Sequence, residues 1–330
     1  MSNQLIYSDL TQDEIDKLAR MDIDVKLDRI TIVGNFNVKY DALKGVLCEI
    51  GWDYDGADDE GYDKFVLLKE RPNARPENKA VIMHNKFQSS WRLDTSNHLN
   101  KKEKTTVIRA LLLMKSKHIT RIDIAFDFIN GPYKGMRHRI FAKNVTQAHL
   151  GENLMYGRSK KIETIYVGRR KSLSLYRYYD KLVEQRSQGK KVDPSIESWE
   201  RLEIQLRGAK TKEWLASAKE MLEGFKLPNI AKAVKVTDTG KVKPLSFQES
   251  CAFQVLVEDP SAWSRIGSKS TKAKYQKLIE ENDGYGFNTS YAKMAYDELK
   301  VKKKALAEEV ESFLADLKER EKQVKDGGAM

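Results

Sequence analysis

The fold is decided by residues 119–128, which read ITRIDIAFDF. From position 122 onward every second residue is Ile, Ile, Phe and Phe, and the positions between them include Asp123 and Asp127. Because successive side chains of a β-strand point to opposite faces of a sheet, this alternation predicts a strand with one apolar and one charged face. Asp123 and Asp127 share the charged face, about 13 Å apart along the strand.

Similar alternation and runs of β-branched or aromatic residues predict more strands on both sides of this stretch. These strands are expected over residues 29–33, 64–68, 80–84, 90–94, 163–167, 172–179 and 199–207. The turn sequence at 168–171 separates two of them and predicts a β-hairpin. Apolar residues at helical spacing predict helices over residues 9–20, 40–50, 102–116 and about 290–325. The acidic stretch 53–63 contains two glycines and is expected to be a loop.

The predicted strands all precede residue 208, beyond which the pattern turns helical, so the predicted fold class is α+β. We expect a large, mostly antiparallel β-sheet core with flanking helices, followed by a helical C-terminal region. The core domain is assigned to residues 1–234, which include an acidic N-terminal segment, and the helical region to residues 245–330. The intervening segment 235–244 is predicted to be a linker.

Charge is unevenly distributed along the 330 residues. The whole chain has 59 Lys+Arg and 48 Asp+Glu, a formal charge of +11, but residues 1–64 have 7 basic and 15 acidic side chains. Residues 134–190 have 14 basic and 4 acidic side chains, interleaved with tyrosines. Such a stretch suits a surface that follows a phosphate backbone and stacks bases. A solvated cationic face without a partner is the alternative.

Several classes of protein are excluded by what the sequence lacks. The longest apolar run, residues 110–114, is far too short to span a bilayer, and the acidic first twenty residues do not resemble a secretory signal. Two cysteines cannot build a disulfide framework or a thiolate zinc site, so a cytoplasmic protein without a membrane partner is expected. Paired metal-binding histidines, a P-loop and a Gly-x-Ser-x-Gly elbow are also missing, which argues against an ATP-driven helicase or a serine hydrolase.

The charged face of the central strand is one candidate for chemistry. Asp123 or Asp127, together with Glu203 from a neighbouring strand, could hold a hard divalent cation, and oxygen ligands favour Mg²⁺ or Mn²⁺ over zinc. The alternative is the solvated outer face of an antiparallel sheet, in which Arg121 and Arg201 form ion pairs with these carboxylates.

The tyrosine-rich strand at residues 176–181 is the other candidate. A tyrosine hydroxyl can attack a DNA phosphate and form a covalent phosphotyrosine. Because the pKa of a free phenol is about 10, a metal ion or a cationic side chain would have to assist that step. Tyrosines that merely fill a strand are the alternative, since tyrosine suits β-structure.

These segments together resemble the Rep_trans family, the rolling-circle replication initiators of staphylococcal-type resistance plasmids. Residues 119–128 resemble the family's R-x-D-x-A-x-D-F strand. The other matching segments are residues 30–35 (ITIVGN), 163–172 (E-T-x-Y-x-G-x-R-x-S), 177–181 (R-x-Y-[ND]-K), 199–203 (similar to W-R-x-E), and Trp263 with the basic run 269–277. The matches follow the family's order over about residues 28–280.

The resemblance implies a role for each matching residue. Tyr179 matches the nucleophile, whereas Tyr176 and Tyr178 become spectators. The basic positions that would bind the scissile phosphate are Lys181 and Arg170. The acidic positions implied to bind Mg²⁺ or Mn²⁺ are Asp123, Asp127 and Glu203. The lysines expected to read duplex DNA from a helix are Lys269, Lys272, Lys274 and Lys277.

The implied function is plasmid rolling-circle replication initiation by a homodimer. Residues 1–234 would nick and rejoin origin DNA, in a topoisomerase-like reaction with a 5′-phosphotyrosine intermediate, and residues 245–330 would recognise the duplex origin. The nick site would be single-stranded, and a host DNA helicase would then unwind the plasmid. Two alternatives stay open: a relaxase of an integrative conjugative element, and a non-catalytic DNA-binding regulator on the same scaffold.

Overall fold

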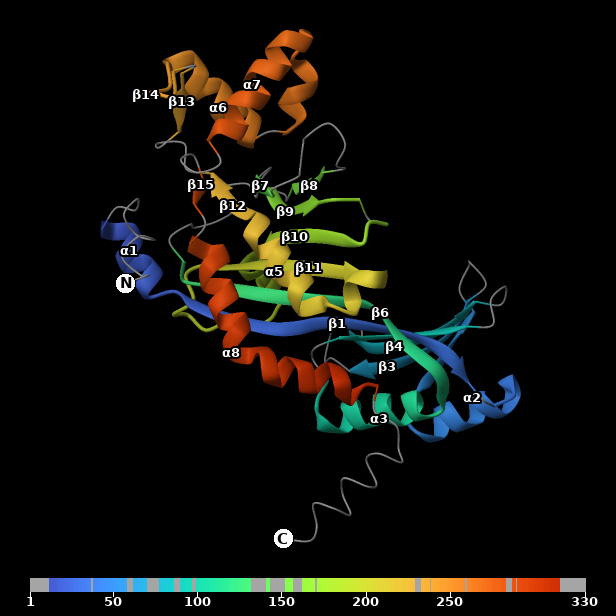
Figure 1. Cartoon of the computed structure of the whole chain (residues 1–330). Helices are drawn as coiled ribbons and strands as arrows, with labels where there is room; N and C mark the ends of the chain where they lie inside the picture. Colours follow the sequence, from blue (N-terminus) through green and yellow to red (C-terminus); the bar gives the residue numbers. More distant parts are fainter. Residues whose placement is uncertain are drawn as a thin grey trace. The chain divides into compact units, whose positions relative to one another are not determined.

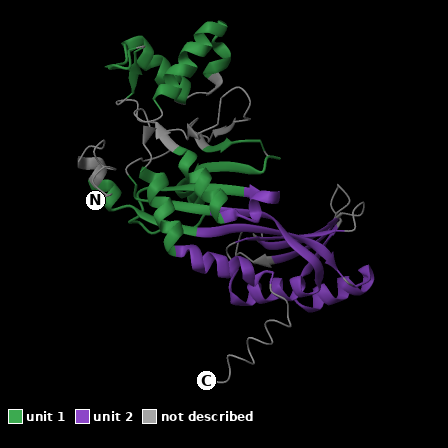
Figure 2. Cartoon of the chain, in the orientation of Figure 1, with its two compact units in different colours: residues 1–25, 125–205, 215–301 green, residues 26–124, 206–214, 302–330 purple. Residues whose placement is uncertain are grey.

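The computed structural model describes most of the chain. The described residues are 12–36, 38–57, 62–69, 77–85, 90–96, 99–131, 141–142, 152–156, 162–169, 171–228, 233–237, 239–258, 260–282, 287–288 and 290–314. They divide into two compact units (Figure 2). Unit 1 comprises residues 1–25, 125–205 and 215–301, and unit 2 comprises residues 26–124, 206–214 and 302–330.

The sheet of unit 1 carries the strand predicted at residues 119–128. This strand is longer than predicted and forms β6 (Met114–Ile129), whose C-terminal part lies in unit 1. The strands that follow β6 in the sheet are, in order, β11 (Trp199–Arg207), β10 (Ser174–Asp180), β9 (Ile162–Val167) and β8 (Glu152–Tyr156). The pairing of β9 with β10 is antiparallel, with Tyr179 opposite Thr164, so the predicted hairpin is confirmed.

Two helices cover one face of this sheet, as Figure 1 shows: α5 (Trp214–Gly224) and the part of α8 (Ser290–Ser312) that belongs to unit 1. The Tyr176 hydroxyl donates to the backbone oxygen of Met221 in α5 at 2.6 Å. Phe128 of β6 stacks on Tyr291 of α8 with ring centroids 4.5 Å apart. The apolar face predicted for the central strand therefore packs into the core beneath these helices.

The rest of unit 1 consists of short elements. The remaining helices around the sheet are α1 (Gln12–Ala19) and α4 (Lys181–Ser187). A small three-stranded sheet is formed by β15 (Phe287–Asn288), β12 (Phe225–Pro228) and β7 (Phe141–Ala142).

Residues 233–282 form a substructure of unit 1 with a hydrophobic core of its own, which we call the C-terminal module. Its elements are β13 (Val234–Val236), β14 (Val242–Pro244), α6 (Phe247–Glu258), the 3₁₀ helix η3 (Pro260–Arg265) and α7 (Lys269–Glu281). Its core includes Phe253, Trp263 and Ile279. The segment expected to be a linker is therefore the β13–β14 hairpin, and the region beyond residue 208 is not purely helical.

Unit 2 is built from a second run of antiparallel strands. Their order is β2 (Asp53–Ala57), β3 (Tyr62–Lys69), β4 (Glu77–Asn85), β5 (Trp91–Ser96) and β1 (Asp22–Phe36), followed by the first part of β6. Its helices are α2 (Tyr40–Glu49), α3 (Lys101–Leu112) and the 3₁₀ helix η1 (Gly208–Thr211). The prediction of a loop over residues 53–63 is wrong, because residues 53–57 pair with β3.

The predicted fold class is confirmed: the chain is α+β, with a large antiparallel sheet and helices in its C-terminal part. The helix predicted over residues 290–325 is observed as α8 up to Ser312, and residues 315–330 lie outside the described residues. Among the described helices, none has the length and apolar character needed to cross a membrane.

Candidate active site

The predicted nucleophile and one predicted carboxylate meet in unit 1. Tyr179 lies on β10 and Glu203 on the adjacent strand β11. The Tyr179 hydroxyl donates a hydrogen bond to Oε1 of Glu203 at 2.7 Å. The ammonium nitrogen of Lys181, at the start of α4, lies 3.4 Å from the same hydroxyl oxygen. A phenol is thus held between a carboxylate and a cation.

Two further charged residues complete this cluster. Arg177, two positions before Tyr179 on the same strand, places Nη1 3.1 Å from Oε2 of Glu203. The guanidinium also lies over the Tyr179 ring, 4.2 Å from its centroid. Lys181 forms an ion pair with Glu184, one turn further along α4. We call Arg177, Tyr179, Lys181, Glu184 and Glu203 the tyrosine cluster.

Local sequence explains where Lys181 lies. Asp180 ends β10 and caps α4, because its side chain accepts a hydrogen bond from the backbone N–H of Val183 at 2.9 Å. The chain therefore turns from strand to helix immediately after Tyr179. This turn brings Lys181 back toward the tyrosine hydroxyl.

The cluster is buried but not sealed. Tyr179 is only 2% exposed, whereas the side chains of Arg177 and Glu184 are 33% and 27% exposed. Burial, and then the charge of Glu203, raise the pKa of Tyr179 well above its ordinary value, although Arg201 and Arg177 act in the opposite direction. The phenol is therefore protonated at neutral pH in this arrangement.

Asp127 makes a different set of contacts on the same face of the sheet. Its two oxygens accept from Nε and Nη2 of Arg201 at 2.6 and 2.8 Å, and Oδ1 also accepts from the indole N–H of Trp199 at 2.8 Å. The Asp127 and Arg201 side chains are almost completely buried. The carboxylate is thus neutralised by a forked ion pair, the geometry that arginine forms best.

Asp123 belongs to unit 2, where its carboxylate is bound by Arg121 of the same strand, with an Nε–Oδ1 distance of 2.7 Å. No group of three or more His, Cys, Asp or Glu that could hold a metal ion occurs in the described part of the chain. Each of the three predicted ligands is bound by an arginine, and a divalent ion at Asp123, Asp127 and Glu203 stays a prediction. The ion-pair alternative describes Asp123 and Asp127 better, but on a buried face rather than a solvated one.

Tyr178 points to the other face, where its hydroxyl donates to Oε2 of Glu200 at 2.6 Å. Both side chains are buried, and burial raises the pKa of Glu200 to about 8. The Tyr176 hydroxyl is bound to α5, as described above. The two tyrosines expected to be spectators thus lie away from the tyrosine cluster.

The lysines predicted to contact DNA lie on α7, and Arg170 lies outside the described residues. Ser268 caps this helix by accepting from the backbone N–H of Thr271. Lys269, Lys274 and Lys277 are exposed, whereas Lys272 is half-buried. Lys277 forms a 3.6 Å ion pair with Glu281.

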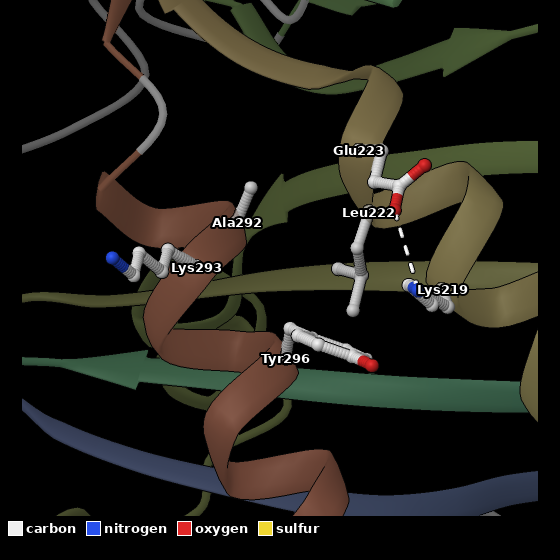
Figure 3. Close-up of a pocket in the computed structure, with 6 residues that line it drawn as sticks. All are labelled: Lys219, Leu222, Glu223, Ala292, Lys293 and Tyr296. Carbon is white, nitrogen blue, oxygen red and sulfur yellow. Dashed lines mark ion pairs between the residues drawn. The ribbon is translucent and has the colours of Figure 1, made fainter. Parts of the chain in front are cut away.

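A pocket lies away from the tyrosine cluster, between α5 and α8 (Figure 3). Its lining residues are Lys219, Leu222, Glu223, Ala292, Lys293 and Tyr296. Lys219 and Lys300 approach the Tyr296 ring, with their ammonium nitrogens 5.6 and 4.2 Å from its centroid. Since it contains none of the predicted site residues, this pocket is not the candidate active site.

The sequence reasoning missed three site residues: Arg177, Glu184 and Arg201. A signal for Arg177 was present, because it lies two positions from Tyr179 and must share its face of the strand. Glu184 lies three positions after Lys181, a spacing that brings helical side chains together. Arg201 was considered only as a partner of exposed carboxylates.

Comparisons with known proteins agree with the motifs. Residues 117–277 match the family model of replication initiation factors, Rep_trans. This part of the chain is therefore similar to replication initiation factors, and the predicted resemblance to the Rep_trans family is confirmed.

A solved structure described as a rolling circle replication initiator protein from Geobacillus stearothermophilus is also similar. It is 15% identical, with a TM-score of 0.40, and the match covers 72% of this chain and 97% of that chain. A search of curated proteins found no match.

Proposed function

We propose that this chain initiates rolling-circle replication by nicking one DNA strand with Tyr179 and later rejoining it. The hydrogen bond from the Tyr179 hydroxyl to Glu203, with Lys181 beside it, is the observation that carries the proposal. A nucleophile needs a proton acceptor within hydrogen-bonding distance and a positive charge near the group that it attacks. The tyrosine cluster offers both.

The proposed nicking step uses residues of this chain alone. The Tyr179 oxygen attacks the scissile phosphorus while its proton passes to the Glu203 carboxylate. The new O–P bond joins the 5′ phosphate to the tyrosine, the bond from phosphorus to the 3′ oxygen breaks, and that oxygen takes a proton from solvent. Rejoining runs the same steps in reverse when the free 3′-hydroxyl attacks the phosphotyrosine.

Lys181 and Arg177 are the proposed phosphate-binding cations. The Nε of Arg177 is buried and has no hydrogen-bond partner within the residues that the structure describes, so a phosphate oxygen could accept from it. Because Tyr179 is buried, a phosphodiester can reach it only if the site opens. The exposed edge formed by Arg177 and Glu184 is the proposed entrance.

Rolling-circle initiators generally use a divalent metal. Asp127 and Glu203, the two predicted ligands of unit 1, are each bound by an arginine, and the proposed steps are written for the protein's own residues. In the proposal, a homodimer positions the chain at the origin, and a host DNA helicase extends the unwound region after nicking.

The C-terminal module is proposed to bind the duplex part of the origin. Lys269 and Lys274 are exposed on α7, the first turn of α7 contains no acidic residue, and no ion-pair partner of either lysine was found across the described ranges. A helix with this character suits the major groove and its phosphate rims. This binding is independent of the chemistry at Tyr179.

A covalent-capture experiment tests the nicking proposal. The protein is incubated with a pool of randomised single-stranded oligonucleotides labelled at the 3′ end, with Mg²⁺, with Mn²⁺ or with EDTA, and separated by denaturing electrophoresis. We expect an SDS-stable adduct with the wild type and none with Tyr179→Phe. Tyr166→Phe is the matched control: it removes a hydroxyl from the neighbouring strand β9 but keeps the ring, whose centroid lies 5.9 Å from the Arg177 guanidinium carbon, so it should not affect adduct formation.

The second candidate function is a non-catalytic DNA-binding regulator. The burial and raised pKa of Tyr179 favour it, since neither assists a nucleophile. The capture experiment separates the two functions. A wild type that binds duplex DNA but forms no adduct under any of the three conditions is a regulator.

A further inference from the structure

The β13–β14 hairpin of the C-terminal module is a very short element that nonetheless has a fixed position. Its strands contain three residues each, and a hairpin of this size is not stable by itself in water. The contacts that hold it come from α6 and from the end of α7.

Asn282, directly after α7, fixes the first strand of the hairpin. Its side chain is 0% exposed; Oδ1 accepts from the Val234 backbone N–H at 2.6 Å, and Nδ2 donates to the Val234 carbonyl at 2.6 Å. The same Nδ2 donates to the Leu278 carbonyl in α7 at 2.7 Å. One amide therefore takes the place of a neighbouring strand and ties the hairpin to the DNA-facing helix.

A buried carboxylate provides the second attachment. Glu249 of α6 accepts from the Lys235 ammonium at 2.7 Å and also bonds the hydroxyl and backbone N–H of Ser246. The hydrogen bond from Lys235 is the main reason why the pKa of Glu249 falls to about 2. Lys235 is thus used for structure, and its charge is neutralised.

The second strand of the hairpin has the opposite character. Lys241 and Lys243 are exposed, and no ion pair of either was found in the described part of the module. Lys241 directly precedes β14, and Lys243 is the middle residue of that strand. Lys243 is directly opposite Lys235. The fold therefore presents two unneutralised cations on an element that is rigidly tied to α7.

We propose that this hairpin is a second DNA-contacting element, in which Lys241 and Lys243 bind backbone phosphates beside the groove that α7 enters. The inference rests on the duplex binding included in the proposed function. Two exposed lysines that bind backbone phosphates would add affinity that does not depend on sequence. Discrimination between sequences would stay with α7.

The salt dependence of duplex binding tests this inference. The probes are a 30-bp duplex obtained by repeated selection from a randomised pool with the full-length protein, and a scrambled duplex of the same composition. The binding constant K falls as salt concentration rises, and each phosphate contact adds about 0.9 to the steepness of log K against log salt concentration. Lys241→Gln/Lys243→Gln should therefore reduce the steepness by about 1.8 on both probes. The ratio of the two affinities should not change.

The control variant is Lys303→Gln/Lys304→Gln, which also removes two exposed lysines, from α8, where Lys304 forms a 3.9 Å surface ion pair with Glu308. It should leave the slope as in the wild type. If the steepness of the salt dependence decreases by one or more in the hairpin variant alone, the inference is supported. A smaller decrease, or an equal decrease in the control variant, overturns it.

The same proteins are tested in the covalent-capture experiment, where both variants should form the wild-type amount of adduct. If the wild type forms no adduct, the nicking proposal fails while the slopes still decide the role of the hairpin. The two proposals can therefore fail separately.

Discussion

The tyrosine-bearing face of the sheet and the C-terminal module both carry many charges but use them differently. On the sheet, Asp127 is paired with Arg201, and Glu203 is bound by Tyr179 and Arg177, all within the protein. On the module, Lys241 and Lys243 are exposed to solvent, whereas Lys235 and Lys277 form ion pairs with Glu249 and Glu281. The charged side chains of the sheet are therefore bound to one another within the protein, whereas the module presents Lys241 and Lys243 to solvent.

The largest expected effect comes from breaking the buried ion pair on the sheet. Arg201→Met leaves the Asp127 carboxylate buried with only the Trp199 indole as a donor among the contacts described above. Removing one partner of a buried pair costs about 3–5 kcal/mol. Denaturant unfolding monitored by circular dichroism should show a loss of that size.

The matched control is Arg92→Met, which removes the same group from a pair with Asp94 that is much more exposed. Its expected cost is below about 1 kcal/mol. If both variants lose the same stability, the buried polar face does not support the fold, and the contrast with the module fails.

A smaller effect is expected from Glu200, the buried acid bound to Tyr178. Its pKa rises from an ordinary value of 4.5 to about 8 on folding, with burial as the main cause and Asp180 adding to it. The folded protein therefore keeps this proton where the unfolded chain has lost it. Below pH 4.5 the group has no effect; its penalty grows between about pH 4.5 and 8 and is complete above pH 8.

Glu200→Gln removes this titration and can still accept from the Tyr178 hydroxyl. The variant should gain on the order of a few kcal/mol over the wild type at pH 8, and less than that at pH 5. Unfolding free energies measured at both pH values check the sign. A gain that is equal at both values would show that Glu200 is not the titrating group.

The contrast between the regions also explains what the sequence could predict. Strict alternation identified β6, β10 and β11, and it placed Tyr179 and Glu203 on sheet faces where they could meet. The alternation could not decide whether Asp127 binds a metal or Arg201, because both arrangements need the same residues on the same face. That choice depends on which strands become neighbours.

The hairpin of the module was missed for a related reason. Residues 235–244 contain lysines, threonines and a glycine, a composition that is typical of a linker, and their strands are too short to show a pattern. The hairpin is held by Asn282, which is far away in sequence. Its position is a tertiary effect that no local propensity predicts.

The smallest expected effect on stability comes from the lysines of α7, and this result would complete the comparison. Lys269→Gln/Lys274→Gln changes two exposed side chains, so the free energy of unfolding should stay within about 0.5 kcal/mol of the wild type. The dependence of log K on log salt concentration should nevertheless become less steep by about 1.8. The preference for the selected over the scrambled 30-bp duplex should also weaken. Lys272→Gln should change the salt slope and the preference for the selected duplex less, because the Lys272 side chain is half-buried. If the α7 variant binds both duplexes as the wild type does, α7 is not the DNA-facing helix, and the module's exposed charges serve another partner.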